Sequence, residues 1–254
     1  MTIRWDPIQY SRYADQRSRP FFDLVARIGA ASPDAVADLG CGTGELTVSL
    51  AQRWPGALVQ GIDSSADMIE RAPREQGVEF RLGTAQEFDA TGIDVLISNA
   101  LLQWVPGHDA LLVRWAEQLA PGGWLAFQVP SNFSAPSHQL MRRLADSPRW
   151  RTALSGVLRV APVAEPSDYL ELLATRGLDV EAWQTEYLHV LQGPDPVLGW
   201  VRGTALRPVL STLSDDDAAE FSAEYASLLR DAYPPWPYGT VFGFRRTFVV
   251  AHKP

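Results

Sequence analysis

Three glycines within five residues separate a short apolar run from a helical pattern near the start of the chain. The apolar run is Ala35–Leu39 and the helical pattern is Glu45–Arg53, with Gly40, Gly42 and Gly44 between them. Glycine suits such a loop because the backbone turns sharply and approaches its neighbours closely, and a Cβ would obstruct both. A strand, a glycine loop and a helix in this order predict an α/β fold with a parallel sheet.

Strand and helix patterns continue to alternate along the chain. Strands are expected at 35–39, 58–62, 78–82, 95–98, 124–129, 180–191 and 241–251, and helices at 45–53, 66–72, 108–119 and 168–176, with two or three more within 194–232. This order predicts a doubly wound, mostly parallel sheet of seven strands. We expect a single domain over residues 1–254, with helical cap insertions at about 131–163 and 194–238 forming a lid.

The negative net charge argues against nucleic acids and anionic membranes as binding partners. The chain has 30 acidic and 22 basic residues, a net charge of −8, whereas nucleic acids and anionic membranes favour basic surfaces. One cysteine, Cys41, excludes an intrachain disulfide and a cysteine-based zinc site. No apolar run approaches the ~20 residues of a membrane span, and none resembles a signal peptide. We expect a cytoplasmic protein with no metal, nucleic-acid, membrane or obligatory protein partner.

The glycine loop also limits the choice of cofactor. It has the pattern D-x-G-x-G-x-G from Asp38 to Gly44, and Asp63 ends the next strand 23 residues after Gly40. That offset is typical of a carboxylate that binds ribose hydroxyls, but the third glycine of a dinucleotide fingerprint falls on Glu45. S-adenosylmethionine has no phosphate, and its cationic groups suit Asp38. The alternatives are a βα turn without ligand and, for Asp63, a helix N-cap.

These motifs, with the turn Pro121-Gly122-Gly123, resemble those of the class I S-adenosylmethionine-dependent methyltransferases. More specifically, the chain resembles the trans-aconitate 2-methyltransferase family through W-D-P-I-Q-Y at 5–10, R-S-R-P at 17–20, N-A-L-L-Q-W at 99–104 and L-R-P at 206–208. The resemblance implies a Rossmann-like fold and S-adenosyl-L-methionine as methyl donor, with S-adenosyl-L-homocysteine as product. It further implies methyl esterification of one carboxylate of trans-aconitate, a small tricarboxylate, to a monomethyl ester.

The resemblance also implies which residues hold the cofactor. They lie in the amino-terminal segment and after the first four strands: Tyr10, Arg17, Asp38, Gly40, Gly42, Gly44, Asp63, Ser64, Met68, Ala85, Gln86 and Asn99. The loop with Ala85 and Gln86 has Thr84 where such enzymes usually carry an acid, so a plain loop is the alternative there. For Tyr10 and Arg17 the alternative is an amphipathic helix packed on the sheet.

A carboxylate acceptor is already ionised at neutral pH, because carboxyl pKa values lie near ~4, so methyl transfer needs no general base. The protein must instead align the reacting atoms, exclude water and hold a trianion, a task that suits arginine. We expect no catalytic side chain, with Gln103 and Trp104 as positioning residues. The candidate substrate-binding residues are Arg207, Tyr187, His189, Trp200 and Asn132, each with a purely structural role as the alternative. Methyl transfer to another small acceptor and a non-catalytic S-adenosylmethionine-binding module remain the alternative functions.

Overall fold

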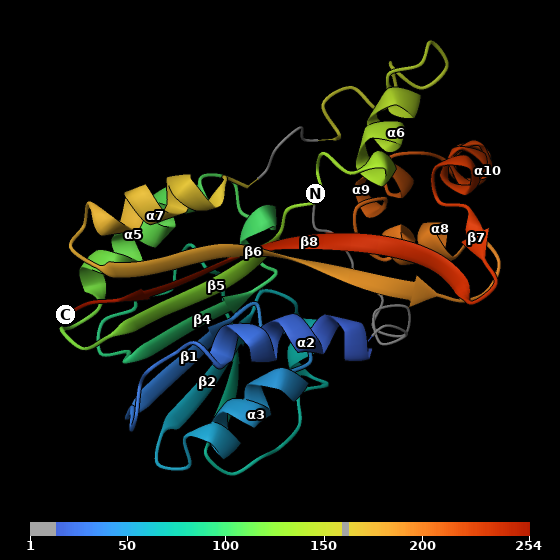
Figure 1. Cartoon of the computed structure of the whole chain (residues 1–254). Helices are drawn as coiled ribbons and strands as arrows, with labels where there is room; N and C mark the ends of the chain where they lie inside the picture. The colour runs from blue at the N-terminus through green and yellow to red at the C-terminus, as the bar shows by residue number, and fades with distance from the viewer. Residues whose placement is uncertain (1–13, 159–162) are drawn as a thin grey trace. The chain divides into compact units, whose positions relative to one another are not determined.

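The computed structural model describes residues 14–158 and 163–254 (Figure 1). Contacts divide the chain into two compact units. The first, here the sheet unit, comprises 17–130, 162–185 and 246–254, and the second, here the helical unit, includes 131–161 and 186–245. The single domain and the cap boundaries of the sequence analysis stay a prediction.

One sheet has the strand order β3-β2-β1-β4-β5-β8-β6, with β7 paired to β8 at the side. The strands are β1 Ala35–Leu39, β2 Leu58–Asp63, β3 Val78–Leu82, β4 Val95–Asn99, β5 Trp124–Pro130, β6 Asp179–Leu191, β7 Pro235–Trp236 and β8 Gly239–His252. Strands β1 to β5 pair in parallel, and β8 runs antiparallel to β5. This arrangement confirms the mostly parallel α/β sheet.

All seven predicted strands are present, and the sheet of the described residues has one strand more. The additional strand is β7, whose two residues pair with Gly239 and Thr240 at the start of β8. A two-residue element shows no alternation of apolar and polar side chains, so no sequence pattern marks it. The predicted helix over 66–72 is shorter in the structure and covers only Ala66–Ile69, because Pro73 has no N–H to bond to the Ile69 carbonyl and the residues between them form turns.

Helices cover both faces of the sheet unit. They are α2 Ala14–Val25, α3 Glu45–Arg53, α4 Ala66–Ile69, α5 His108–Gln118 and α7 Pro166–Ala174. In Figure 1, α2 and α3 lie on one face of β1 to β5, and α5 and α7 lie on the other. Leu39, Leu96, Trp115 and Phe127 are completely buried in the core beneath them. Burial on both faces explains why β1, β4 and β5 are mainly apolar runs, whereas β3 at the edge of the sheet alternates apolar and charged residues.

The helical unit has a core of its own. Its helices are α6 Pro136–Ala145, α8 Pro196–Arg202, α9 Arg207–Leu210 and α10 Asp215–Ala232, so the expected two or three helices of 194–232 are three. Trp150, Trp200, Phe221 and Phe242 pack together there. None of the helices in residues 14–158 and 163–254 is both long and apolar enough to cross a bilayer.

Candidate functional site

The parallel strands bring most of the predicted cofactor residues to one edge of the sheet unit. β1, β2, β3 and β4 end at this edge, and each is followed by one of the predicted loops. The glycine loop follows β1, Asp63 ends β2, Ala85 and Gln86 follow β3, and Asn99 ends β4. Ligands of open α/β sheets bind at this carboxyl edge.

The three loop glycines all have left-handed backbone, but they serve different purposes. Their φ angles are 76° at Gly40, 57° at Gly42 and 77° at Gly44. A Cβ on Gly40 would lie 2.9 Å from the Leu101 Cβ, and one on Gly44 would collide with the Phe80 ring. A Cβ on Gly42 would meet no atom of the described residues within 4 Å. Gly40 and Gly44 therefore permit internal packing, and Gly42 is the one whose missing side chain leaves space for a ligand.

Asp63 has a structural task in addition to its predicted one. Its Oδ2 accepts a hydrogen bond from the Gly42 N–H at 2.9 Å, and its Oδ1 accepts one from the Ser65 N–H at 2.9 Å. The carboxylate thus fixes the glycine loop against the end of β2. Each oxygen keeps a second lone pair, so Asp63 can still accept from a ribose hydroxyl. Ser64 beside it is exposed, and Met68 is buried in α4.

Asp38 is a buried carboxyl directly before the loop. Only 2% of it is exposed, and the Thr47 hydroxyl donates to its Oδ2 at 2.7 Å. Its Oδ1 is buried and has no hydrogen-bond partner among the described residues. Burial raises the pKa of the Asp38 carboxyl to about 6, against the Thr47 hydrogen bond, and the charge of Asp63 adds to the rise. An unsatisfied buried oxygen of this kind suits a cationic group, which fits the ammonium end of S-adenosylmethionine.

The loop after β3 offers mainly backbone groups to the candidate site. Thr84 donates to the Glu87 carboxylate at 2.7 Å, which closes a turn. Ala85 is buried, and its carbonyl accepts a long bond of 3.4 Å from the Arg114 guanidinium. Gln86 is exposed. Their contact with a cofactor stays a prediction.

A row of polar side chains crosses one face of the sheet at this edge. Strand register places Asp38 of β1, Asn99 of β4, Gln128 of β5 and Arg246 of β8 on the same face. The Arg246 guanidinium donates to Gln128 Oε1 at 3.1 Å, and Gln128 Nε2 donates to Asn99 Oδ1 at 2.5 Å. We call Asn99, Gln128 and Arg246 the amide relay. Sequence reasoning missed Gln128, although a glutamine within the apolar run 124–129 is a signal.

The predicted positioning residues lie just after β4, in the short 3-10 helix Leu102–Trp104. Ala100, before this helix, has an unusual φ of 56° for a residue with a side chain. Gln103 Nε2 donates to the Ala100 carbonyl at 2.5 Å, while its Oε1 is buried without a partner in the described parts of the chain. Trp104 is half-buried. The segment is thus a strained turn that contains a buried amide oxygen.

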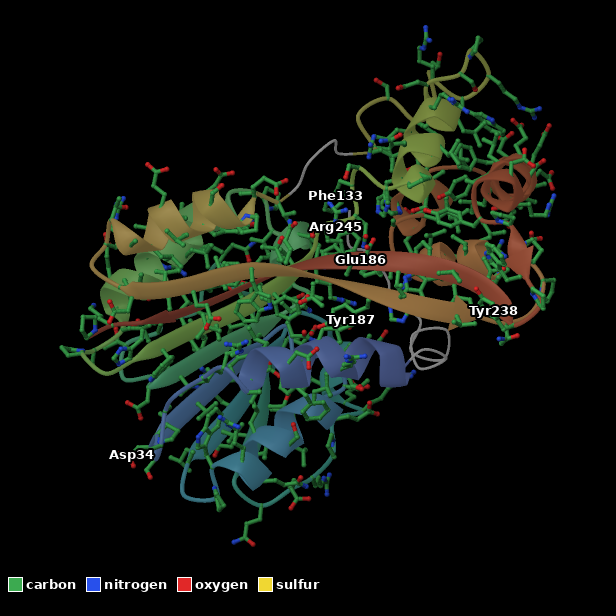
Figure 2. All side chains as sticks on the ribbon, viewed as in Figure 1. Asp34, Phe133, Glu186, Tyr187, Tyr238 and Arg245 are labelled. Atoms are coloured by element: carbon green, nitrogen blue, oxygen red, sulfur yellow. The ribbon has the colours of Figure 1, made fainter. Side chains whose placement is uncertain are left out.

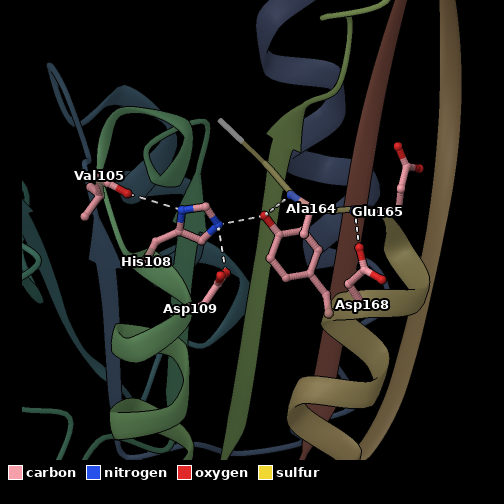
Figure 3. Close-up of polar contacts among 7 residues, drawn as sticks. Val105, His108, Asp109, Ala164, Glu165 and Asp168 are labelled. Carbon is pink, nitrogen blue, oxygen red and sulfur yellow. Dashed lines mark hydrogen bonds and ion pairs between the residues drawn. The ribbon is translucent and has the colours of Figure 1, made fainter. Parts of the chain in front are cut away.

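A hydrogen-bond network anchors the segment that follows (Figure 3). His108 Nδ1 bonds to the Val105 carbonyl at 3.2 Å, and Nε2 lies 2.7 Å from the Tyr169 hydroxyl of α7. The carbonyl can only accept, so Nδ1 carries a proton, while Nε2 faces both the Tyr169 hydroxyl and, at 3.4 Å, the Asp109 Oδ1. The Tyr169 oxygen accepts in turn from the Ala164 N–H at 3.2 Å. This network ties the turn after β4 to α7.

The predicted substrate residues lie in the helical unit. Tyr187 and His189 of β6 are buried and share one face, with their rings stacked at 6.4 Å, and His189 stacks on Trp200 at 4.7 Å. Figure 2 shows Tyr187 on β6 next to Glu186. Asn132 Oδ1 accepts from the Arg245 N–H at 2.6 Å.

Two of these residues also have a structural role. Trp200 belongs to the core of the helical unit, and the Asn132 carbonyl accepts the Ala135 N–H in a turn. Arg207 begins α9 and is half-buried. Their contact with a substrate stays a prediction.

Two predicted residues belong to the amino-terminal segment. Tyr10 lies outside the described residues, and Arg17 lies in α2. Across residues 14–158 and 163–254, no three His, Cys, Asp or Glu side chains come together in a way that could hold a metal ion.

Known proteins resemble this chain over nearly its full length. A family model described as a methyltransferase domain matches residues 13–182. The trans-aconitate 2-methyltransferase of Streptomyces avermitilis is 50% identical over 98% of this chain and 97% of that protein. The protein of the same name from Streptomyces coelicolor is 52% identical over 98% of this chain and 87% of that protein.

A solved structure is similar in fold. It is the geranyl diphosphate C-methyltransferase of Streptomyces coelicolor in complex with Mg2+, geranyl diphosphate and S-adenosyl-L-homocysteine. The two structures superpose with a TM-score of 0.54 at 17% identity, over 97% of this chain and 82% of that one.

Proposed function

Since the chain belongs to the trans-aconitate 2-methyltransferase family, we propose that it transfers a methyl group from S-adenosyl-L-methionine to one carboxylate of trans-aconitate. The products are S-adenosyl-L-homocysteine and a monomethyl ester. The observation that carries the proposal is the near-full-length identity of about half of all residues with proteins of that name. The carboxyl edge of the sheet unit supports it, because the glycine loop follows the buried Asp38 carboxyl, is open at Gly42 and is held at the Gly42 N–H by the Asp63 carboxylate.

The proposed cofactor residues are those of the carboxyl edge. Asp38 would receive the ammonium group, Gly42 would allow the backbone to approach the ligand, and Asp63 would accept from the ribose hydroxyls. When bound, the cofactor supplies a methyl group activated by its positively charged sulfur. Ala85 and Gln86 would border the adenine, with Asn99 at the end of β4 as a further contact.

The chain's own task in the reaction is to hold and align the acceptor. A carboxylate needs no deprotonation near neutral pH, so the site does not need a general base. Gln103 and Trp104 would keep the acceptor oxygen in line with the methyl group and exclude water. We propose Arg207, Tyr187, His189, Trp200 and Asn132 for the trianion, with Arg207 supplying positive charge.

The net charge of −8 supports a small-molecule substrate rather than a nucleic acid or a membrane surface. A metabolic tricarboxylate also suits a cytoplasmic location, which we propose on that ground. We propose that the enzyme acts without an obligatory protein partner.

The test is methyl transfer from radiolabelled S-adenosylmethionine to trans-aconitate, cis-aconitate, isocitrate and citrate, each at equal concentration. We expect trans-aconitate to have the highest kcat/KM and mass spectrometry to detect its monomethyl ester. Turnover confined to a different acceptor would refute the substrate. Tight binding of S-adenosylhomocysteine without turnover of any acceptor would instead indicate a non-catalytic binding module.

A further inference from the structure

The amide relay has a direction that its chemistry dictates. Arg246 is only 4% exposed and Gln128 is completely buried, and they are joined by the 3.1 Å bond from Arg246 Nη1 to Gln128 Oε1. A guanidinium can only donate hydrogen bonds. Gln128 must therefore turn its oxygen toward Arg246 and its NH2 group toward Asn99.

The same logic fixes the Asn99 amide. The Gln128 NH2 group donates at 2.5 Å, so Asn99 must turn its oxygen toward Gln128. The Asn99 NH2 group then points away from the relay. Asn99 is half-buried and ends β4 at the carboxyl edge, where the glycine loop also lies. The relay thus presents a hydrogen-bond donor, and not an acceptor, at the proposed site.

We propose that Arg246 and Gln128 are positioning residues, which hold the Asn99 amide so that its NH2 group binds a carboxylate. Hydrogen bonds in series polarise one another, and this series begins at a positive charge, which strengthens the terminal donor toward an anion. The inference rests on the proposed function for the identity of the ligands. Two of them carry a carboxylate, the amino-acid end of the cofactor and the tricarboxylate substrate.

Gln128→Glu tests the relay because it reverses the relay's direction with almost no change in shape. The Arg246 guanidinium keeps the introduced carboxyl ionised, and an ionised carboxylate cannot donate. Asn99 must then turn its NH2 group toward position 128 and present its oxygen to the site. We expect affinity for the carboxylate ligand to fall about 10- to 100-fold, because a charge-assisted hydrogen bond is lost and an oxygen faces an anion.

Calorimetry and kinetics identify which carboxylate is bound. If it is the cofactor's, S-adenosylhomocysteine binds Gln128→Glu more weakly while 5′-methylthioadenosine, which lacks the amino-acid end, binds as to wild type. If it is the substrate's, the KM for trans-aconitate rises with kcat within about threefold, and S-adenosylhomocysteine binding is unchanged. General damage to the fold would lower the affinity for 5′-methylthioadenosine as well, and that result would overturn the proposal.

Gln118→Glu is the matched control. Gln118 accepts the Ala90 N–H at 3.1 Å through Oε1, and a carboxylate can make the same bond, so all affinities should stay at wild-type values. A folded Gln128→Glu variant with wild-type affinity for both ligands would overturn the inference. If that variant does not fold, Asn99→Asp removes the NH2 group itself, and wild-type affinity there would overturn it equally.

The inference and the proposed function fail in different ways. Absence of turnover of trans-aconitate by the wild-type protein refutes the function. The calorimetric comparison of S-adenosylhomocysteine with 5′-methylthioadenosine needs no turnover. It therefore tests the role of the amide relay independently of the proposed function.

Discussion

Asp38→Asn should make the ligand-free protein more stable at neutral pH while it weakens cofactor binding. The Asp38 carboxyl is 2% exposed, and one of its oxygens has no partner among the described residues. Its charge is therefore unfavourable in the folded protein until a cation arrives. Asparagine keeps the shape and can still accept from Thr47, but it carries no charge.

The magnitude follows from the pKa of the Asp38 carboxyl, which burial raises from 3.8 to about 6. Because the folded-state pKa lies above the unfolded-state value, the folded protein binds this proton more tightly than the unfolded chain does. The stability of the wild type therefore falls as pH rises from about 3.8 to about 6 and levels off above that range. At ~1.36 kcal/mol per pKa unit, the full loss is roughly 3 kcal/mol.

Urea unfolding of both proteins at several pH values measures this loss. Asparagine does not titrate, so the free energy of unfolding of the variant minus that of the wild type should increase with pH. Between pH 4.5 and 7.5, we expect an increase of about 2 kcal/mol, because part of the window lies below pH 4.5. Constant effects of the substitution, such as an unpaired amide N–H, cancel in this comparison.

The control is Asp34→Asn, since Asp34 is exposed and precedes the same strand, far from the loop (Figure 2). This control measures how the loss of one exposed carboxylate alone changes the stability difference with pH. A stability difference for Asp38→Asn that rises with pH no more than that of the control would refute the assigned pKa. Calorimetry with S-adenosylmethionine completes the test, because loss of a buried charge partner should weaken binding by at least about tenfold. Wild-type affinity would show that Asp38 does not meet the cationic end of the cofactor.

Three further predictions concern the loop and the substrate. Gly42→Ala and Gly122→Ala both place a side chain at positive φ with no described atom within 4 Å, so each should cost roughly 1–2 kcal/mol of stability. Only Gly42→Ala should weaken S-adenosylmethionine binding in calorimetry. Equal affinities of the two variants for S-adenosylmethionine would show that the glycine loop does not contact the cofactor. Asp63→Ala removes the acceptor of two backbone N–H groups and should lower the free energy of urea unfolding by about 2–4 kcal/mol as well as cofactor affinity; unchanged stability would contradict its anchoring role. Arg207→Ala should raise the KM for trans-aconitate about 30-fold without affecting S-adenosylmethionine affinity. A change below about threefold would show that a different cationic residue binds the substrate.

Local sequence patterns were sufficient to predict most strands and helices of the sheet unit. The predicted bounds of β1, β3 and α3 match the structure, because each is a run of apolar or amphipathic residues with a break at both ends. The sequence pattern also identified Gly42 and Gly44, but it did not predict that Gly44 permits internal packing while Gly42 leaves open space. Which glycine packs against a neighbour depends on Phe80, a residue of another strand.

The amide relay could not be predicted from the sequence. Gln128 and Arg246 are 118 positions apart and become neighbours only because β8 pairs with β5. The double role of Asp63 was missed for a similar reason. A carboxylate after a strand is typical both of a ribose ligand and of a helix N-cap, whereas its actual backbone partners include Gly42, which is 21 positions earlier.

The position of β8 between β5 and β6 has a consequence for the protein as it is made on the ribosome. β8 is translated after both of its neighbours, so β5 and β6 each present an open strand edge until residues 239–252 emerge. Exposed edges invite pairing with other chains, and a nascent chain stalled before β8 should therefore depend on chaperones more than the finished chain does. Rare codons placed between β6 and β8 would prolong that interval and should increase aggregation without any change in the amino-acid sequence.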